Sequence, residues 1–170
     1  MKLYEKKQNK YYIQLKIWIS FVIVIILQIT YLKIQNYFST YKISLINLFL
    51  IYWLSTEPNK INIGNSFLIG LITDIMFYSI LGTHALSFSI LSYLITVKFQ
   101  NFKKMHYIKQ IIIITLLFLI TEFIISYNKL LYIKTKTFNI NTIQLLIECI
   151  INNILWICIQ KIMNKLHNKK

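Results

Sequence analysis

The sequence predicts an all-α protein, a polytopic membrane helix bundle with six transmembrane helices, and three observations point to this class. The 170-residue chain is 56% hydrophobic, with a mean hydropathy of +0.57. Its apolar residues are gathered in runs that end at lysines, whereas soluble domains spread them at helix or strand period. Two apolar runs joined by a few residues are typical of a membrane hairpin, and the first of these runs contains one acid, Asp74. Residues 1–170 therefore form a single integral membrane domain in this interpretation.

The charge of the chain excludes several soluble classes. The net charge is +14, all nineteen basic residues are lysines, and only five residues are acidic, which is too few for a mixed soluble surface. A nucleic-acid-binding domain gathers its basic residues in one patch, often with Arg. Here the lysines lie at the ends of apolar runs. We therefore expect no nucleic-acid partner.

The first two apolar runs lie near the N-terminus, and the second of them is the weakest candidate for a span. Ile17–Leu32 lies between Lys16 and Lys33 and spans about 24 Å as a helix, so the lysines must snorkel. Residues 1–16 form a basic cytoplasmic segment, and no small-residue cleavage site follows the run, which favours a retained anchor over a signal peptide. Ile43–Thr56 spans about 21 Å. If this run does not cross the bilayer, the chain has five spans.

Four further runs complete the predicted bundle. The third and fourth runs, Ile63–Leu81 and Ala85–Val97, form the hairpin. The fifth and sixth runs are Ile111–Tyr127 and Ile143–Met163, and residues 164–170 form a basic cytoplasmic tail. Fourteen of the nineteen lysines fall on the side of the N-terminus when the runs alternate across the membrane. The positive-inside rule therefore places both termini in the cytoplasm, where the basic face lies on anionic lipid.

Three acids lie inside the predicted spans. Asp74, Glu122 and Glu148 each fall about 8–11 Å from the outer boundary in this topology, so they could meet around one polar cavity. One interpretation is a proton or cation path, or a substrate site. The preferred interpretation is hydrogen bonding from helix to helix by protonated carboxyls, with Asn152 on the same helix face as Glu148.

Small residues recur at helical spacing on both sides of the hairpin. Ser66, Gly70 and Asp74 share one stripe of the first helix, and Ala85 and Ser89 share one of the second. Small residues four apart let two helix backbones approach closely. The stripe predicts packing within the bundle, with a partner helix from another protein as the alternative.

The turn of the hairpin offers no catalytic set. Gly82 provides a tight turn, Thr83 is a candidate helix cap, and His84 is interpreted as a polar interface residue rather than a metal ligand. Cys149 and Cys158 are nine residues apart and point to opposite sides of a helix, so we interpret them as small apolar residues. The sequence contains no glycine-rich phosphate loop and no pair of histidines at metal-binding spacing. We expect no enzyme activity, no cofactor and no small-molecule substrate.

A set of short motifs resembles a known family. In chain order they are Tyr52-Trp53, Pro58, Asn62-Ile63-Gly64, Ile69-Gly70-Leu71-Ile72-Thr73-Asp74-Ile75, Leu81-Gly82-Thr83-His84-Ala85-Leu86 and Tyr93-Leu94. This pattern is similar to that of the rod shape-determining protein MreD family, in which an acid also commonly stands at the position of Glu122. The chain departs from the family where Lys42-Ile43-Ser44 replaces an Arg-Pro-Asp or Arg-Pro-Asn sequence.

The resemblance implies a role in bacterial cell elongation. Proteins of this kind are multi-pass components of the cytoplasmic (inner) membrane that work with MreC-like and MreB-like proteins to organise lateral peptidoglycan synthesis. It implies a scaffold, with Gly70, Asp74, Gly82, His84, Glu122 and Glu148 as candidates for helix packing or partner contact. The alternative is a small substrate-binding or transport subunit that uses the intramembrane acids.

Overall fold

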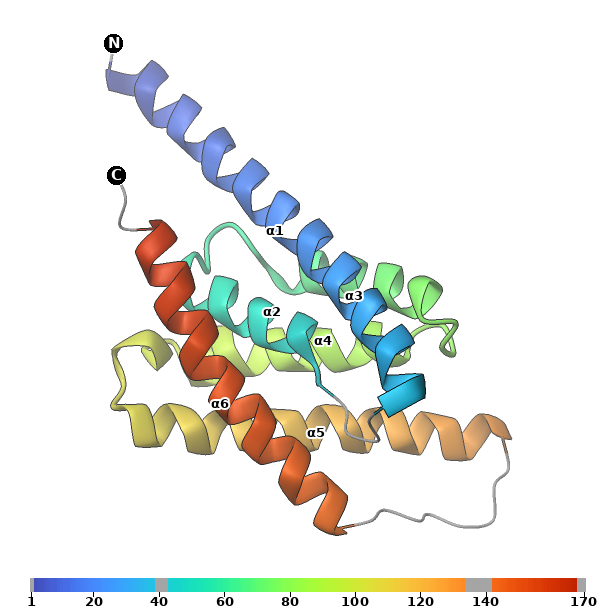
Figure 1. Cartoon of the computed structure of the whole chain (residues 1–170). Helices are drawn as coiled ribbons and strands as arrows, with labels where there is room; N and C mark the ends of the chain where they lie inside the picture. The colour runs from blue at the N-terminus through green and yellow to red at the C-terminus, as the bar shows by residue number, and fades with distance from the viewer. Residues whose placement is uncertain (1, 39–42, 134–141, 168–170) are drawn as a thin grey trace.

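The computed structural model describes residues 2–38, 43–133 and 142–167, and these residues form an all-α bundle without a strand (Figure 1). The predicted fold class is therefore confirmed. A π-helical turn, Leu94–Lys98, extends the fourth helix, and a short 3-10 helix, Phe102–Lys104, precedes the fifth. The α-helices are α1 (Lys2–Phe38), α2 (Leu45–Thr56), α3 (Ile63–Met76), α4 (Thr83–Tyr93), α5 (Tyr107–Ile133) and α6 (Thr142–His167).

The six helices differ in their capacity to cross a bilayer. Three of them contain apolar stretches of sufficient length, at Tyr11–Lys33, Tyr107–Asn128 and Ile143–Lys165. Helices α2 and α3 have 12 and 14 residues, and these lengths correspond to about 18 and 21 Å, against about 30 Å for a hydrocarbon core. Within the described chain the helix count agrees with the sequence, whereas the six-span topology stays a prediction.

Several helix boundaries differ from those of the predicted runs, and the differences in α1 and α3 have clear physical reasons. Helix α1 extends well beyond Ile17–Leu32 at both ends, because its flanks contain no Gly or Pro that would break a helix. Helix α3 ends at Met76 instead of Leu81. Tyr78 leaves the helix with a φ of +50°, and the Ser79 backbone N–H bonds back to the Asp74 carbonyl oxygen at 3.0 Å. The turn therefore begins five residues earlier than the apolar run suggests.

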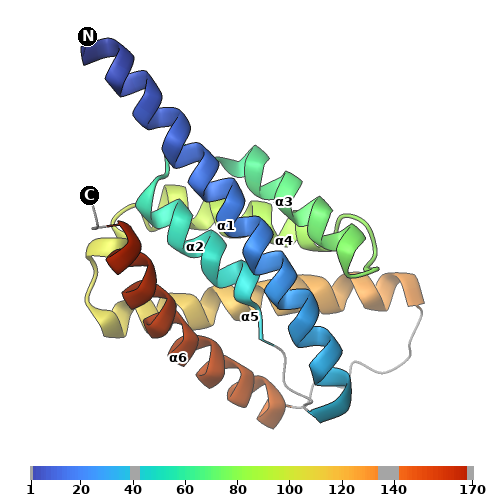
Figure 2. The same ribbon diagram turned by 45° about the horizontal axis from the view of Figure 1, so that its top comes forward.

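The helices run back and forth, so that the ends of α1 and α6 nearest the termini lie on the same side of the bundle (Figures 1 and 2). Helix α3 packs mainly against α4, and α4 packs in turn against α5. The basic tail predicted at 164–170 is described only as far as residue 167, and Lys42 also lies outside the described residues.

Helix α2 occupies the centre of the bundle (Figure 2). Eight of its twelve residues are buried, and it contacts α1, α4 and α6. Residues such as Val22, Ile112, Phe123 and Ile154 on the three long helices are instead at least half exposed. A helix that is apolar all round belongs in a core, and exposed apolar faces belong against lipid. Helix α2 is thus enclosed by its neighbours, two of which, α1 and α6, are long helices.

Candidate functional site

The backbones of α3 and α4 approach most closely at Gly70. A Cβ atom added to Gly70 would lie 2.6 Å from the Ala85 backbone N and 2.7 Å from the His84 carbonyl oxygen, with the Ala85 Cα closer still. These atoms belong to the backbone and cannot turn aside as a side chain would. Only glycine therefore fits at position 70 in this packing. The structure places the stripe of small residues inside the bundle, facing α4.

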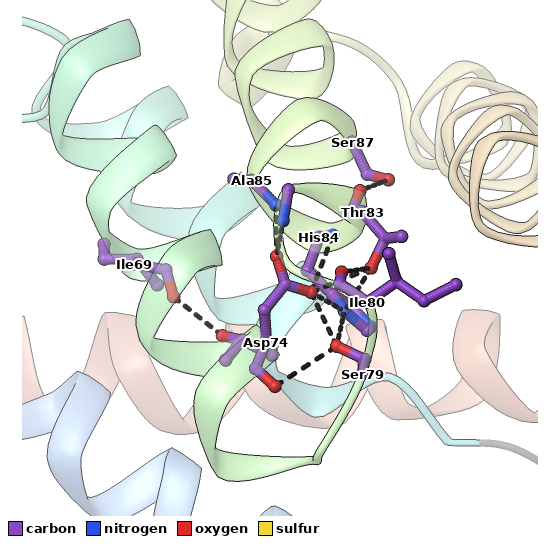
Figure 3. Close-up of polar contacts among 10 residues, drawn as sticks. Ile69, Asp74, Ser79, Ile80, Thr83, His84, Ala85 and Ser87 are labelled. Atoms are coloured by element: carbon purple, nitrogen blue, oxygen red, sulfur yellow. Dashed lines mark hydrogen bonds and ion pairs between the residues drawn. The ribbon is translucent and has the colours of Figure 1, made fainter. Parts of the chain in front are cut away.

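Asp74 lies two residues before the end of α3 and is completely buried. Its side chain points at the first turn of α4 (Figure 3). Oδ2 accepts from the Gly82 backbone N–H at 2.8 Å, and Oδ1 accepts from the His84 backbone N–H at 3.0 Å. Backbone N–H groups at a helix start have no partner within the helix and attract a negative charge. Asp74 thus caps α4 from the neighbouring helix.

The cap residue of α4 is Gly82, not Thr83 as predicted. Gly82 has a φ of +96°, a left-handed conformation that favours glycine, and it has no side chain with which to cap. Asp74 takes over that role. The hydroxyls of Ser79 and Thr83 lie 2.6 and 2.8 Å from Asp74 Oδ1 and donate to it (Figure 3).

His84 is oriented by the same carboxylate. Its Nδ1 lies 2.7 Å from Asp74 Oδ1, and its ring makes edge contacts with Phe77 and Phe88. An imidazole nitrogen this close to an acceptor-only carboxylate donates its N–H to that carboxylate. The sequence had identified His84 only as a polar interface residue, and its pairing with Asp74 depends on the early end of α3.

A second polar junction holds the start of α2. The Ser44 backbone N–H donates to Asn152 Oδ1 on α6 at 3.2 Å, and the Leu45 N–H donates to Gln28 Oε1 on α1 at 3.0 Å. The Gln28 amide also donates to the Ile43 carbonyl oxygen at 2.6 Å. Inside a bilayer each such group needs a partner from the protein. Two long helices therefore fix the position of the short one.

The three predicted acids do not all meet at one place. A cavity of about 130 Å³ is lined by Glu122 of α5 and by His84, through which Asp74 is connected to it. Glu148 of α6 is buried but does not line this cavity, and it accepts from the Gln144 side chain at 3.1 Å. Of the three acids predicted to share one cavity, Glu122 lines it, Asp74 is connected to it through His84, and Glu148 does not line it.

Sequence reasoning missed several buried amides that organise the bundle. Gln28 and Asn47 are buried, and both line the cavity. Gln110 donates to the Phe102 and Met105 carbonyl oxygens and accepts from the Trp156 indole N–H at 3.3 Å. For Gln28 and Asn47 the available signal was an amide residue within an apolar run, which marks an interior position as an acid does, whereas Gln110 lies just before its run. Among the described residues, no cluster of His, Cys, Asp and Glu could hold a metal ion.

Comparison with known proteins gives a consistent result. The family model for "rod shape-determining protein MreD" matches residues 9–166. A curated relative, the rod shape-determining protein MreD of Haemophilus influenzae, is 39% identical over 83 residues, an alignment that covers 45% of this chain and 51% of the relative. The chain thus matches about half the length of that relative. No solved structure matches the chain.

Proposed function

Because the chain belongs to the rod shape-determining protein MreD family, we propose that it is an integral membrane component of the machinery that elongates rod-shaped bacterial cells. The family match over nearly the whole chain carries this proposal. The three apolar helices of sufficient length support a location in the cytoplasmic (inner) membrane. The excess of lysine on one side supports cytoplasmic termini and a chain that crosses six times.

The proposed role is that of a scaffold that links MreC-like and MreB-like proteins and thereby organises lateral peptidoglycan synthesis, without catalysing a reaction. Most of the described chain is helix that either packs inside the bundle or presents apolar side chains. Such a protein acts through its helix faces and short connections. Gly70 and Asp74 are buried against α4, so they support partner binding by fixing the shape of the α3–α4 hairpin.

The connection between α4 and α5 is the proposed contact for a cytoplasmic partner. Lys98, Lys103, Lys104 and Lys109 are all exposed there. Phe102 is buried between them, and its ring packs against Trp156 of α6 at 5.6 Å between centroids. The connection is therefore anchored, and its positive charges are held on the outside. An acidic surface beneath the membrane is the matching partner chemistry.

Depletion of the protein in its own cells tests the proposed role. We expect rods to become round and lateral insertion of labelled peptidoglycan precursor to decline, with recovery when the wild-type chain is expressed again. Rods that keep their width after many generations without the protein would contradict the proposal.

Affinity purification from detergent-solubilised membranes tests the partners separately. We expect an MreC-like protein to copurify with the wild-type chain and an MreB-like protein to be lost from the Lys103→Gln/Lys104→Gln variant. Retention of the MreB-like protein by that variant, at equal membrane level, would exclude the proposed contact.

A further inference from the structure

Helix α3 lies at an edge of the bundle, and its outer face is apolar from one end to the other (Figure 2). The helix packs mainly against α4. Apolar side chains are 40–51% exposed along it at Ile63, Leu68, Ile72 and Met76. In a membrane protein such a face lies against acyl chains. The lipid at this edge therefore meets a helix of only 14 residues.

This lipid-facing edge is much shorter than the long helices. Fourteen residues of α3 rise about 21 Å, and the 11 residues of α4 with the five of its π-helical turn rise at most about 24 Å. The apolar stretches of α1, α5 and α6 have 23, 22 and 23 residues, or about 33–35 Å. To match even 24 Å, these stretches would tilt by about 45°, beyond the usual range of 0–40°. One bilayer thickness therefore does not fit both parts of the protein.

The hairpin has no charged side chain at its outer end that could reach across the missing thickness. Lys33 lies at the outer end of the first apolar run and can snorkel to the surface. Between Lys60 and Lys98 the sequence has no Lys, Arg or Glu, and the acid there, Asp74, points at the first turn of α4 (Figure 3). Tyr78 at the tip is 98% exposed, and its hydroxyl needs water or headgroups. The headgroups must therefore come down to the tip.

We propose that the outer face of the α3–α4 hairpin binds a locally thin bilayer and therefore selects phospholipids with short acyl chains. A bilayer thins beside a short apolar surface at a modest cost for each Å, and shorter chains lower that cost. The long helix α5 meets lipid of ordinary thickness in the same molecule. This inference rests on the proposed six crossings and does not depend on the role in cell shape.

Lipid selectivity at two matched positions tests the proposal in the purified full-length protein. Ile72 on α3 and Leu116 on α5 each lie nine residues after the first residue of their helix, and they are 40% and 48% exposed. Each is replaced by cysteine in a Cys149→Ala/Cys158→Ala background and labelled with pyrene. The labelled proteins are placed in nanodiscs of eighteen-carbon phosphatidylcholine with a small, equal fraction of a brominated fourteen-carbon or twenty-two-carbon phosphatidylcholine.

The measured quantity is the ratio of quenching by the short brominated lipid to quenching by the long one. We expect this ratio to be about two- to fivefold higher at Ile72→Cys than at Leu116→Cys, because lipid beside α3 is sorted by chain length. Leu68→Cys and Ile112→Cys, each five residues after the start of its helix, repeat the comparison at another depth. Equal ratios within both pairs would overturn the proposal and leave the face of α3 to a protein partner.

The position of the hairpin tip is tested separately by its reaction with a membrane-impermeant maleimide. Leu81→Cys at the tip is compared with Lys33→Cys at the outer end of the first apolar run, and both side chains are exposed. In eighteen-carbon bilayers we expect the two cysteines to react from the same side at rates within about threefold, because the thinned bilayer brings the surface to the tip. A reaction of Leu81→Cys at least about tenfold slower would show an immersed tip in a bilayer of ordinary thickness and would refute the proposal.

Discussion

The contact between Gly70 and α4 leads to the sharpest prediction, because the chain contains its own control. Gly64 lies on the same helix, and a Cβ there would approach only the Asn62 side chain, at 3.7 Å. A Cβ on Gly70 would instead lie 2.6–2.7 Å from two backbone atoms of α4. Carbon atoms prefer separations of about 3.5–4.0 Å. The backbone of α4 must therefore move by about 1 Å to admit a methyl group at position 70.

The magnitude follows from two opposing terms. Alanine is a better helix former than glycine by about 1 kcal/mol, which favours both substitutions. Overpacking a tight contact costs about 1–3 kcal/mol. In Gly70→Ala, the shift of α4 also lengthens the bonds that Asp74 accepts from Gly82 and His84, now 2.8 and 3.0 Å. We expect Gly70→Ala to lose about 1–3 kcal/mol of stability and Gly64→Ala to lose none.

Reversible unfolding of each variant in mixed micelles of mild detergent and SDS, followed by circular dichroism, measures this difference. Gly64→Ala should unfold at the wild-type SDS fraction or above it, and Gly70→Ala should unfold below it. Equal midpoints for the two alanine variants would show that α3 and α4 do not approach closely at this position.

Three further predictions test the polar contacts and the turn. Asp74→Asn should destabilise the hairpin by about 1–3 kcal/mol in the same unfolding assay, because the amide NH₂ replaces one acceptor and faces N–H and O–H donors; a wild-type midpoint would refute the cap. Gln28→Leu should cost about 1–2 kcal/mol and speed hydrogen exchange at the start of α2, and unchanged exchange there would exclude Gln28 as its cap. Tyr78→Gly should raise stability by up to about 1 kcal/mol, because Tyr78 is 98% exposed and has a φ of +50°; a loss of stability would show that the side chain makes a contact worth more than the strain.

The architecture of the hairpin was largely predictable from the sequence. Gly70, Asp74 and Ala85 stand at spacings that predict two helices in close contact, and the structure has this contact. The hydrophobic runs also located all six helices. In an apolar medium the backbone groups of a long apolar segment must bond to one another, which favours a helix. What the runs could not show was where α3 ends, because Phe77 to Leu81 are almost as apolar as the helix before them.

The position of the C-terminal end of α3 determines which groups surround Asp74. With α3 continuing to Leu81, Asp74 lay within the helix and was interpreted as a protonated carboxyl that hydrogen-bonds to another helix. With the end at Met76, the same side chain meets the first turn of α4 and His84. Which donors surround an acid is a tertiary property that spacing along one helix does not contain. For the same reason, the sequence could not show that Glu122 lines the cavity and that Glu148 on α6 does not.

A measurement of cell shape tests most directly whether the close contact between α3 and α4 is needed for the proposed function. The measurement is the width and length of cells whose sole copy of the gene encodes Gly70→Ala or Gly64→Ala, at equal amounts of protein in the membrane. We predict round cells with the first variant and normal rods with the second. Normal rods with both variants would contradict a role for the close contact between α3 and α4 in maintaining the rod.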